Sequence, residues 1–172
     1  GSLSYGSSGI GSLGHLLGEL IKQLGGVTIL HVAYKGATPA ISDLMGGHIH
    51  ATYIADSSAV EFVRSGKLRM LATTTERRVP GVPEVPAMNE IVPGVHGSLW
   101  YGVSAPAKTP QSVIDRLQKE ILSAINSSEL QVGLTGIGMT PLPLGPDKFA
   151  TFIQSEMNKW GPIIKANNIR ID

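Results

Sequence analysis

The sequence contains no cysteine, and its 172 residues carry few aromatic side chains and little net charge. Without cysteine there can be no disulfide, no thiolate metal site and no cysteine nucleophile. A net charge of +1 with neutral histidines lacks the clustered lysine and arginine that bind nucleic acids and membrane surfaces. No hydrophobic run approaches the roughly 18 residues of a membrane span. We therefore predict no nucleic-acid partner and no membrane-spanning segment.

What is present indicates a folded chain. Hydrophobic residues make up 42% of the sequence and charged residues 16%, a balance that supports a packed core. The length fits one domain or two small lobes. The chain begins with Gly-Ser rather than methionine, and no signal peptide is recognisable. A removed export signal or a missing N-terminal segment is compatible with that beginning.

Short strands and helices alternate over the first 75 residues. Hydrophobic residues recur at three- and four-residue steps from 13 to 24, which predicts a helix capped by Ser12 and ended by Gly25 and Gly26. The other predicted elements are strands at 3–7, 27–34, 49–54 and 68–73, a helix from Pro39 capped by Thr38, and a helix at 57–65. This alternation predicts a parallel sheet flanked by helices.

The pattern changes from residue 79 onward. A proline-rich crossover at 79–93 contains one predicted helical turn near 88–91. A strand is predicted at 98–105, an extended piece at 139–142, and helices at 111–126, 128–135 and 146–166. This half has too few strands for a second sheet, although its amphipathic helices need a surface to cover. We expect a sheet supplied by absent sequence or by another chain, and self-association if the chain is truncated.

The run Gly9 to Gly14, GIGSLG, fits the dinucleotide fingerprint G-x-G-x-x-G. That fingerprint also needs an acidic residue at the end of the second strand, where this chain reads Ala-Tyr-Lys at 33–35. A triphosphate-binding loop needs a lysine after the glycines, and none follows. We therefore predict no nucleotide cofactor, and no other cofactor is indicated.

Three predicted helix N-termini follow parallel strands and therefore lie at one edge of the predicted sheet. They are Gly9–Ser12, Gly36–Thr38 and Asp56–Ser58. Each offers backbone N–H groups and a partial positive charge, so together they can hold a carboxylate or a phosphate. The other interpretation, that they are only helix caps and tight turns, is about equally supported.

No arrangement of side chains indicates catalysis. Ser7 and Ser8 lack a G-x-S-x-G elbow and an identifiable base, and no carboxylate pair suggests acid–base chemistry. His48 and His50 lie two residues apart on a predicted strand but have no third metal ligand, and His15 is predicted to be a packed or capping residue. We predict neither an enzyme nor a metal site; a general base beside Ser7 or Ser8 would revive the enzyme hypothesis.

Ordered motifs along the chain then point to a family. They are YGSSGIGS (5–12), HLLGELIKQL (15–24), HVAYKGATPA (31–40), DLMGG (43–47), SGKLR (65–69), PEVP (83–86), SLWYG (98–102), APAKTP (105–110) and FIQSEMNKW (152–160). Together they closely resemble the second lobe of the Bug-type receptors. These are the periplasmic substrate-binding proteins of tripartite tricarboxylate transporters (TctC-like). The resemblance covers essentially the whole chain.

The resemblance implies an α/β, type II periplasmic-binding-protein-like fold whose two lobes close on a small carboxylate. It implies one complete lobe with its crossover over 1–97, and an incomplete first lobe, its returning strand and helices, over 98–172. It also implies a periplasmic location, delivery of the ligand to membrane transporter subunits, and no catalysis. A ligand-sensing regulatory domain of the same fold is the alternative.

By position, the resemblance places ligand contacts in the first two glycine-containing turns, largely through backbone amides. The third helix start is included as well, although Tyr-Ile-Ala-Asp at 53–56 displaces by two positions the acidic residue of the family's Phe-Asp-Asn-like stretch. Ile10 stands where a polar residue is common, which favours a ligand with an aromatic or alkyl body. The predicted ligand-binding residues are Ser7, Ser8, Gly9, Gly11, Ser12, Gly36, Ala37, Thr38, Asp56 and Ser57.

Overall fold

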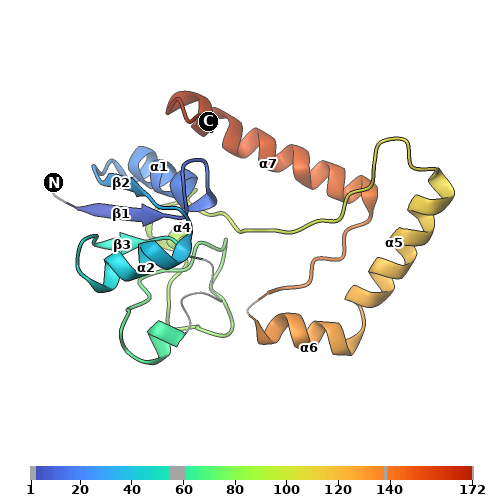
Figure 1. Cartoon of the computed structure of the whole chain (residues 1–172), viewed down its shortest axis with the longest axis horizontal. Helices are drawn as coiled ribbons and strands as arrows, with labels where there is room; N and C mark the ends of the chain where they lie inside the picture. Colours follow the sequence, from blue (N-terminus) through green and yellow to red (C-terminus); the bar gives the residue numbers. More distant parts are fainter. Residues whose placement is uncertain (1–2, 55–60, 138, 172) are drawn as a thin grey trace. The chain divides into compact units, whose positions relative to one another are not determined.

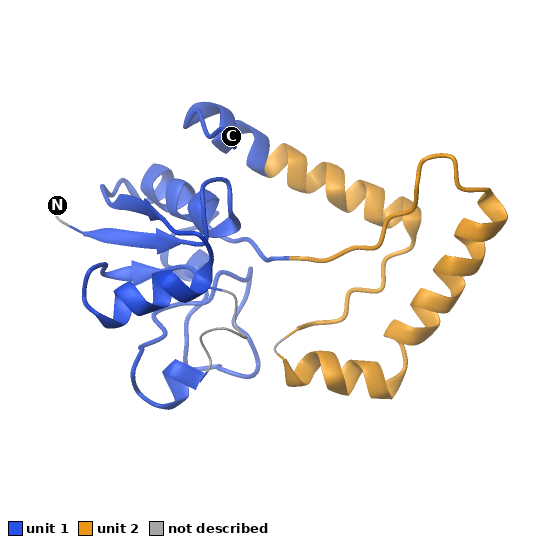
Figure 2. Ribbon diagram, viewed as in Figure 1, with its two compact units in different colours: residues 1–99, 160–172 blue, residues 100–159 orange. Residues whose placement is uncertain are grey.

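The computed structural model of the chain describes residues 3–54, 61–137 and 139–171 (Figure 1). The chain divides into two compact units. One comprises residues 1–99 and 160–172, and the other comprises residues 100–159 (Figure 2). In the described part of the chain, no helix is long and apolar enough to cross a membrane.

The first unit is built on a small parallel sheet. Its elements in chain order are β1 (Ser4–Ser7), α1 (Leu13–Gly25), β2 (Leu30–Ala33), α2 (Ala37–Met45) and β3 (Ala51–Thr52). The strand order is β2-β1-β3, with both pairings parallel, so β1 lies at the centre. One crossover runs from β1 through α1 to β2, the other runs from β2 through α2 past β1 to β3, and α1 and α2 lie on opposite sides of the sheet (Figure 1). The predicted parallel sheet with flanking helices is therefore confirmed.

Helix α1 follows the sequence prediction at both ends. The Ser12 hydroxyl caps it by accepting a hydrogen bond from the His15 N–H, and Gly26 adopts a left-handed conformation after the last turn. Its apolar face forms the main core with residues from two distant segments. That core contains Leu16, Leu17, Leu20, Ile21, Val95, Trp160 and Ile163.

Helix α2 begins earlier than predicted. It starts at Ala37 rather than Pro39, and its N-cap is Gly36 rather than Thr38. Gly36 has a φ of 115°, which side-chain-bearing residues rarely adopt, so the glycine turns the chain into the helix two residues ahead of the proline. Because Gly36 has no side chain, the N-cap residue itself provides no capping hydrogen bond.

Two predicted strands are wrong. Residues 68–73 contribute only an isolated bridge between Thr73 and Ala87, because Thr73 exchanges its backbone hydrogen bonds with the proline-rich loop instead of the sheet. Residues 98–105 form no ladder with any described strand, and a β-strand is stable only when its backbone groups are paired. The strands predicted at 27–34 and 49–54 exist but are shorter. The predicted helix at 57–65 is helical at 61–64, and 57–60 lie outside the described residues.

The predicted turn in the crossover is present as α4 (Met88–Ile91). The Glu90 carboxylate accepts from the Ala87 N–H at 3.0 Å and pairs with Arg78 at 2.9 Å, which anchors the loop before this turn.

The second unit contains α5 (Gln111–Ile125), α6 (Ser128–Gly136) and the first part of α7 (Pro146–Ala166). These helices confirm the predicted ones. Trp100 packs edge-on against Phe149 and Phe152, with ring centroids 5.7 and 5.3 Å apart. No described residue between 100 and 159 is buried, so the apolar faces of these helices are left uncovered within this unit.

Gly18 of α1 allows the helix to approach the sheet, because a Cβ at this position would overlap the ring of Tyr5. We expect Gly18→Ala to lower the free energy of unfolding by about 1–3 kcal/mol through overpacking. Urea denaturation measures the change. Gly133→Ala, in a helix with open space at that position, is the matched control and should not destabilise the chain. Equal stability of Gly18→Ala and the parent chain would contradict this packing.

Candidate ligand-binding site

The first turn, residues Ser7 to Ser12, connects the end of β1 to the start of α1. Gly9 and Gly11 have φ values of 144° and 75°, so this path of the chain requires glycine at both positions. Beside Gly11, a Cβ would stand 2.9 Å from Cδ1 of Ile171. The turn is therefore both conformationally special and closely packed.

The backbone N–H groups of this turn have partners within the protein. Gly9 donates to Ser7 Oγ at 3.3 Å, and Gly11 donates to Nδ1 of His15 at 3.1 Å. The Ser12 N–H and hydroxyl both donate to the Gly9 carbonyl, at 3.2 and 2.7 Å. These bonds hold the turn in shape. A ligand that uses these three amides must share or displace internal hydrogen bonds.

The second turn, residues Gly36 to Thr38 at the start of α2, lies directly beside the first. The Tyr34 N–H donates to the Ser7 carbonyl at 3.0 Å, and the Gly36 N–H donates to the Ser8 carbonyl at 3.2 Å. Both turns therefore sit at the carboxyl edge of the sheet. Ala37 and Thr38 form the first turn of α2, whose leading N–H groups have no partner within the helix.

The structure thus brings eight of the ten predicted site residues to one edge of the sheet, in two adjacent turns. They are Ser7, Ser8, Gly9, Gly11, Ser12, Gly36, Ala37 and Thr38. The remaining two, Asp56 and Ser57, lie outside the described residues.

Ser7 has a base beside it, which the sequence analysis did not find. Its Oγ lies 2.7 Å from Nε2 of His31, on the neighbouring strand β2. The side chain is fully buried, and the same Oγ also donates to the Gly9 carbonyl at 3.0 Å. A nucleophile must reach its substrate, and this oxygen has no exposed surface. The contact is a structural hydrogen bond and does not revive the enzyme hypothesis.

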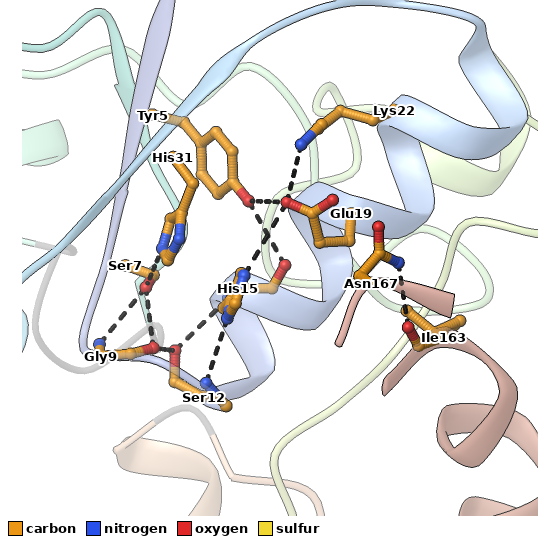
Figure 3. A network of polar contacts seen from close by, with 11 residues as sticks. Tyr5, Ser7, Gly9, Ser12, His15, Glu19, Lys22, His31, Ile163 and Asn167 are labelled. Atoms are coloured by element: carbon orange, nitrogen blue, oxygen red, sulfur yellow. Dashed lines mark hydrogen bonds and ion pairs between the residues drawn. The ribbon is translucent and has the colours of Figure 1, made fainter. Parts of the chain in front are cut away.

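His31, which is partly buried, and the buried His15 form a stack behind the first turn (Figure 3). Their ring centroids are 4.0 Å apart and their planes differ by 11°. The ring of Tyr5 stacks on the other side of His31 at 4.9 Å. His15 was predicted to be packed, and this is confirmed. Aligning the two parallel strands could have found the partner of His31. In that register His31 lies opposite Tyr5, and Ser7 is two positions further along the same face of the sheet.

A carboxylate completes this network. The Tyr5 hydroxyl donates to Glu19 Oε1 and to the His15 carbonyl, both at 3.4 Å. Glu19 is only 7% exposed, and Lys22 pairs with it at 2.9 Å. The Lys22 ammonium thus compensates this buried carboxylate, because a charge taken out of water is costly unless it is paired.

Burial sets the protonation of these groups. Burial and the neighbouring His15 lower the pKa of His31 to about 4, and burial also lowers the pKa of His15. In the other direction, burial raises the pKa of Tyr53 to about 12 and, with the Glu19 carboxylate, raises the pKa of Tyr5. At neutral pH both histidines and both tyrosines are therefore uncharged.

The other histidine pair does not form a metal site. His48 and His50 precede β3 rather than lying on it, and Nδ1 of His50 accepts from the Ser4 N–H at 3.2 Å. No cluster of potential metal ligands occurs within the described ranges.

Comparison with solved structures establishes the class of fold. R. palustris Rpa4515 with adipate has a TM-score of 0.86 and 33% identity, covering 97% of this chain and 56% of that one. MatC (Rpa3494) from Rhodopseudomonas palustris with bound malate has a TM-score of 0.77 and 28% identity, covering 94% and 56%. The expected fold, α/β and type II periplasmic-binding-protein-like, is confirmed.

The family follows from the sequence. The profile described as "Tripartite tricarboxylate transporter family receptor" matches residues 1–169, and the chain belongs to this family. BugT of Bordetella pertussis is 32% identical over 172 residues, covering 99% of this chain and 53% of its own length. The resemblance to Bug-type receptors is therefore confirmed, and the family is one of receptors rather than enzymes. The chain spans about half the length of these relatives.

The stacked histidines make the free energy of unfolding depend on pH. Because the pKa of His31 lies near 4 in the folded chain and near 6.5 when unfolded, only the unfolded chain binds a proton between these values. We expect the free energy of unfolding to fall as the pH decreases from about 6.5 to about 4. Urea denaturation across this range measures the effect. His31→Gln should flatten the curve, whereas His48→Gln, at an exposed position, should not. Identical curves for all three proteins would rule out the effect.

Proposed function

We propose that this chain is the ligand-binding portion of a periplasmic receptor that takes up a small carboxylate and delivers it to a tripartite tricarboxylate-type membrane transporter. The observation that carries the proposal is the pair of adjacent turns at the carboxyl edge of the parallel sheet. Membership of the receptor family supports it. So do the two similar structures, one with adipate and one with bound malate.

The chemistry of the two turns suits an anion. The N-termini of α1 and α2 follow the ends of β1 and β2, so their partial positive charges lie at the same sheet edge. A carboxylate placed there needs no positively charged side chain, because backbone N–H groups at a helix start hold it directly. No chemical step is required of the site, which accords with the burial of Ser7.

The start of α2 is the strongest part of the proposed site. The N–H groups of Ala37 and Thr38 belong to its first turn, where the N-cap Gly36 has no side chain to accept from them. In the Ser7–Ser12 turn, by contrast, the N–H groups of Gly9, Gly11 and Ser12 already have partners within the protein. We therefore assign the principal carboxylate contacts to the amides of Ala37 and Thr38. Asp56 and Ser57 remain proposed contacts at the third helix start.

The energy of such contacts is adequate for a receptor. Each hydrogen bond from an amide to a charged acceptor contributes roughly 1.5–3 kcal/mol. Two or three of them, after the cost of association, correspond to roughly micromolar affinity.

A binding experiment tests the proposal. We expect adipate, malate or another small carboxylate to raise the thermal stability of the full-length protein, by roughly 2.7 kcal/mol at about a hundred times the dissociation constant. A thermal-shift screen against mono-, di- and tricarboxylates and aromatic acids measures this. A panel without any binder would contradict the receptor function.

The contribution of α2 is tested by Ala37→Pro. Proline is favoured at the first position of a helix and removes a single N–H donor there. The affinity for the carboxylate found in the screen should fall roughly 10- to 100-fold, the value of one charge-assisted bond. Ser128→Pro makes the same change at the first position of α6 and should leave the affinity unchanged. Unchanged affinity in Ala37→Pro would move the site away from α2.

The uncovered helices of the second unit lead to a prediction about partners. Val103 and Val132 are 71% and 74% exposed, and Met157 is 62% exposed. Apolar side chains exposed to this extent favour association. We expect a second copy of this chain to cover them, so that the mass measured by sedimentation equilibrium rises above 18.1 kDa with concentration. Val103→Ser combined with Val132→Ser should weaken the association. A constant mass of one chain would contradict it.

A further inference from the structure

The stack of the buried His15 and the partly buried His31 makes no part of the proposed ligand contacts, yet it touches both ends of the first turn. One ring belongs to α1 and the other to β2. At the start of the turn, Nε2 of His31 lies 2.7 Å from Ser7 Oγ. At its far end, Nδ1 of His15 accepts the Gly11 N–H at 3.1 Å. The two contacts bracket the residues that separate β1 from α1.

The bond from Gly11 dictates the state of His15. A backbone N–H can only donate, so Nδ1 of His15 must carry a lone pair and no proton. The neutral ring then carries its proton on Nε2, which lies 3.8 Å from Oε1 of Glu19. Protonation at Nδ1 would turn it into a second donor facing the Gly11 N–H, and two donors cannot form a hydrogen bond with each other. The Gly11 bond and a charged His15 are therefore mutually exclusive.

The Ser7 end has a related constraint. Ser7 Oγ accepts from the Gly9 N–H and donates to the Gly9 carbonyl, so its remaining contact is filled when Nε2 of His31 donates to it. A neutral His31 with its proton on Nε2 therefore completes the hydrogen bonds of the Ser7 hydroxyl. A second proton would place a charge on a ring that lies 4.0 Å from His15.

We propose that His15 and His31 are positioning residues that hold the Ser7–Ser12 turn in shape while both rings are neutral, and that protonation of His15 releases the Gly11 amide. The stacked pair thereby couples the conformation of the turn to pH. An effect of this release on carboxylate binding rests on the proposed function. The positioning of the turn by the two histidines does not depend on it.

The surrounding groups determine the direction of the response. Glu19 favours the charged form of both rings, Lys22 disfavours it, and His15 disfavours it at His31, on whose other face the ring of Tyr5 stacks. Burial is the largest influence on both rings and lowers the pKa of each. The neutral, turn-holding state therefore prevails at neutral pH, and release belongs to the acid side of the ordinary histidine range.

The test is made on the full chain without ligand, so its outcome is independent of whether any carboxylate binds. The amide of Gly11 and the ring protons of His15 are followed by NMR from pH 7.5 to 4. We expect the Gly11 amide shift to move with the same midpoint as the His15 ring. Its protection from hydrogen exchange, corrected for intrinsic rates, should fall roughly 3- to 10-fold, the value of one hydrogen bond.

Two variants separate positioning from mere packing. His15→Asn keeps an acceptor near the place of Nδ1 but cannot titrate, so Gly11 should remain protected throughout the pH range. His48→Gln removes an exposed histidine and should leave the Gly11 titration as in the parent chain. A Gly11 amide that titrates equally in His15→Asn would overturn the proposal.

The parent chain alone keeps the proposal testable if His15→Asn fails to fold. In that case the proposal is overturned if the His15 ring titrates while the chemical shift of the Gly11 amide stays constant. Coinciding midpoints support it.

Discussion

The parallel pairing of β1 with β2 is the interaction on which the rest of the first unit depends. It sets His31 beside Tyr5 and within reach of Ser7, and it carries the chain onward so that Gly36 donates to the Ser8 carbonyl. Both turns of the candidate site owe their proximity to this pairing. A parallel ladder has its strand ends, and hence the starts of the following helices, on one edge. An anion site built from backbone amides needs these helix starts to lie together at one edge.

A second constraint is the neutrality of the interior behind the first turn. Ionised groups are costly to bury unless they are paired. Glu19 is paired with Lys22, and the histidine stack avoids the cost by remaining uncharged. The same hydrogen bonds that satisfy these buried groups also occupy the turn's amides. The backbone donors proposed for a ligand are therefore those at the start of α2, where the N-cap is a glycine without a capping side chain.

In the second unit, the helices form without a buried core of their own among the described residues. Its helices form where the sequence pattern predicts them, and the Ser127 hydroxyl caps α6 by accepting the Leu130 N–H. Periodicity describes the faces of a helix and not what covers them. The chain spans about half the length of its relatives, and none of the described residues between 100 and 159 is buried. The segment at 98–105 has strand-like composition but forms no ladder, because no strand among the described residues pairs with it.

Local physical chemistry in the sequence alone determined the helices, the caps at Ser12 and Gly26, the parallel alternation and the two glycine turns. These depend on residues close together in the chain. Tertiary structure decided the pairing of Ser7 with His31, the stacking of His15, and the assignment of Gly11's amide to an imidazole. It also decided that 68–73 leave the sheet for the proline-rich loop. Such contacts join residues distant in sequence, and only the register of packed elements specifies which of many compatible partners meet.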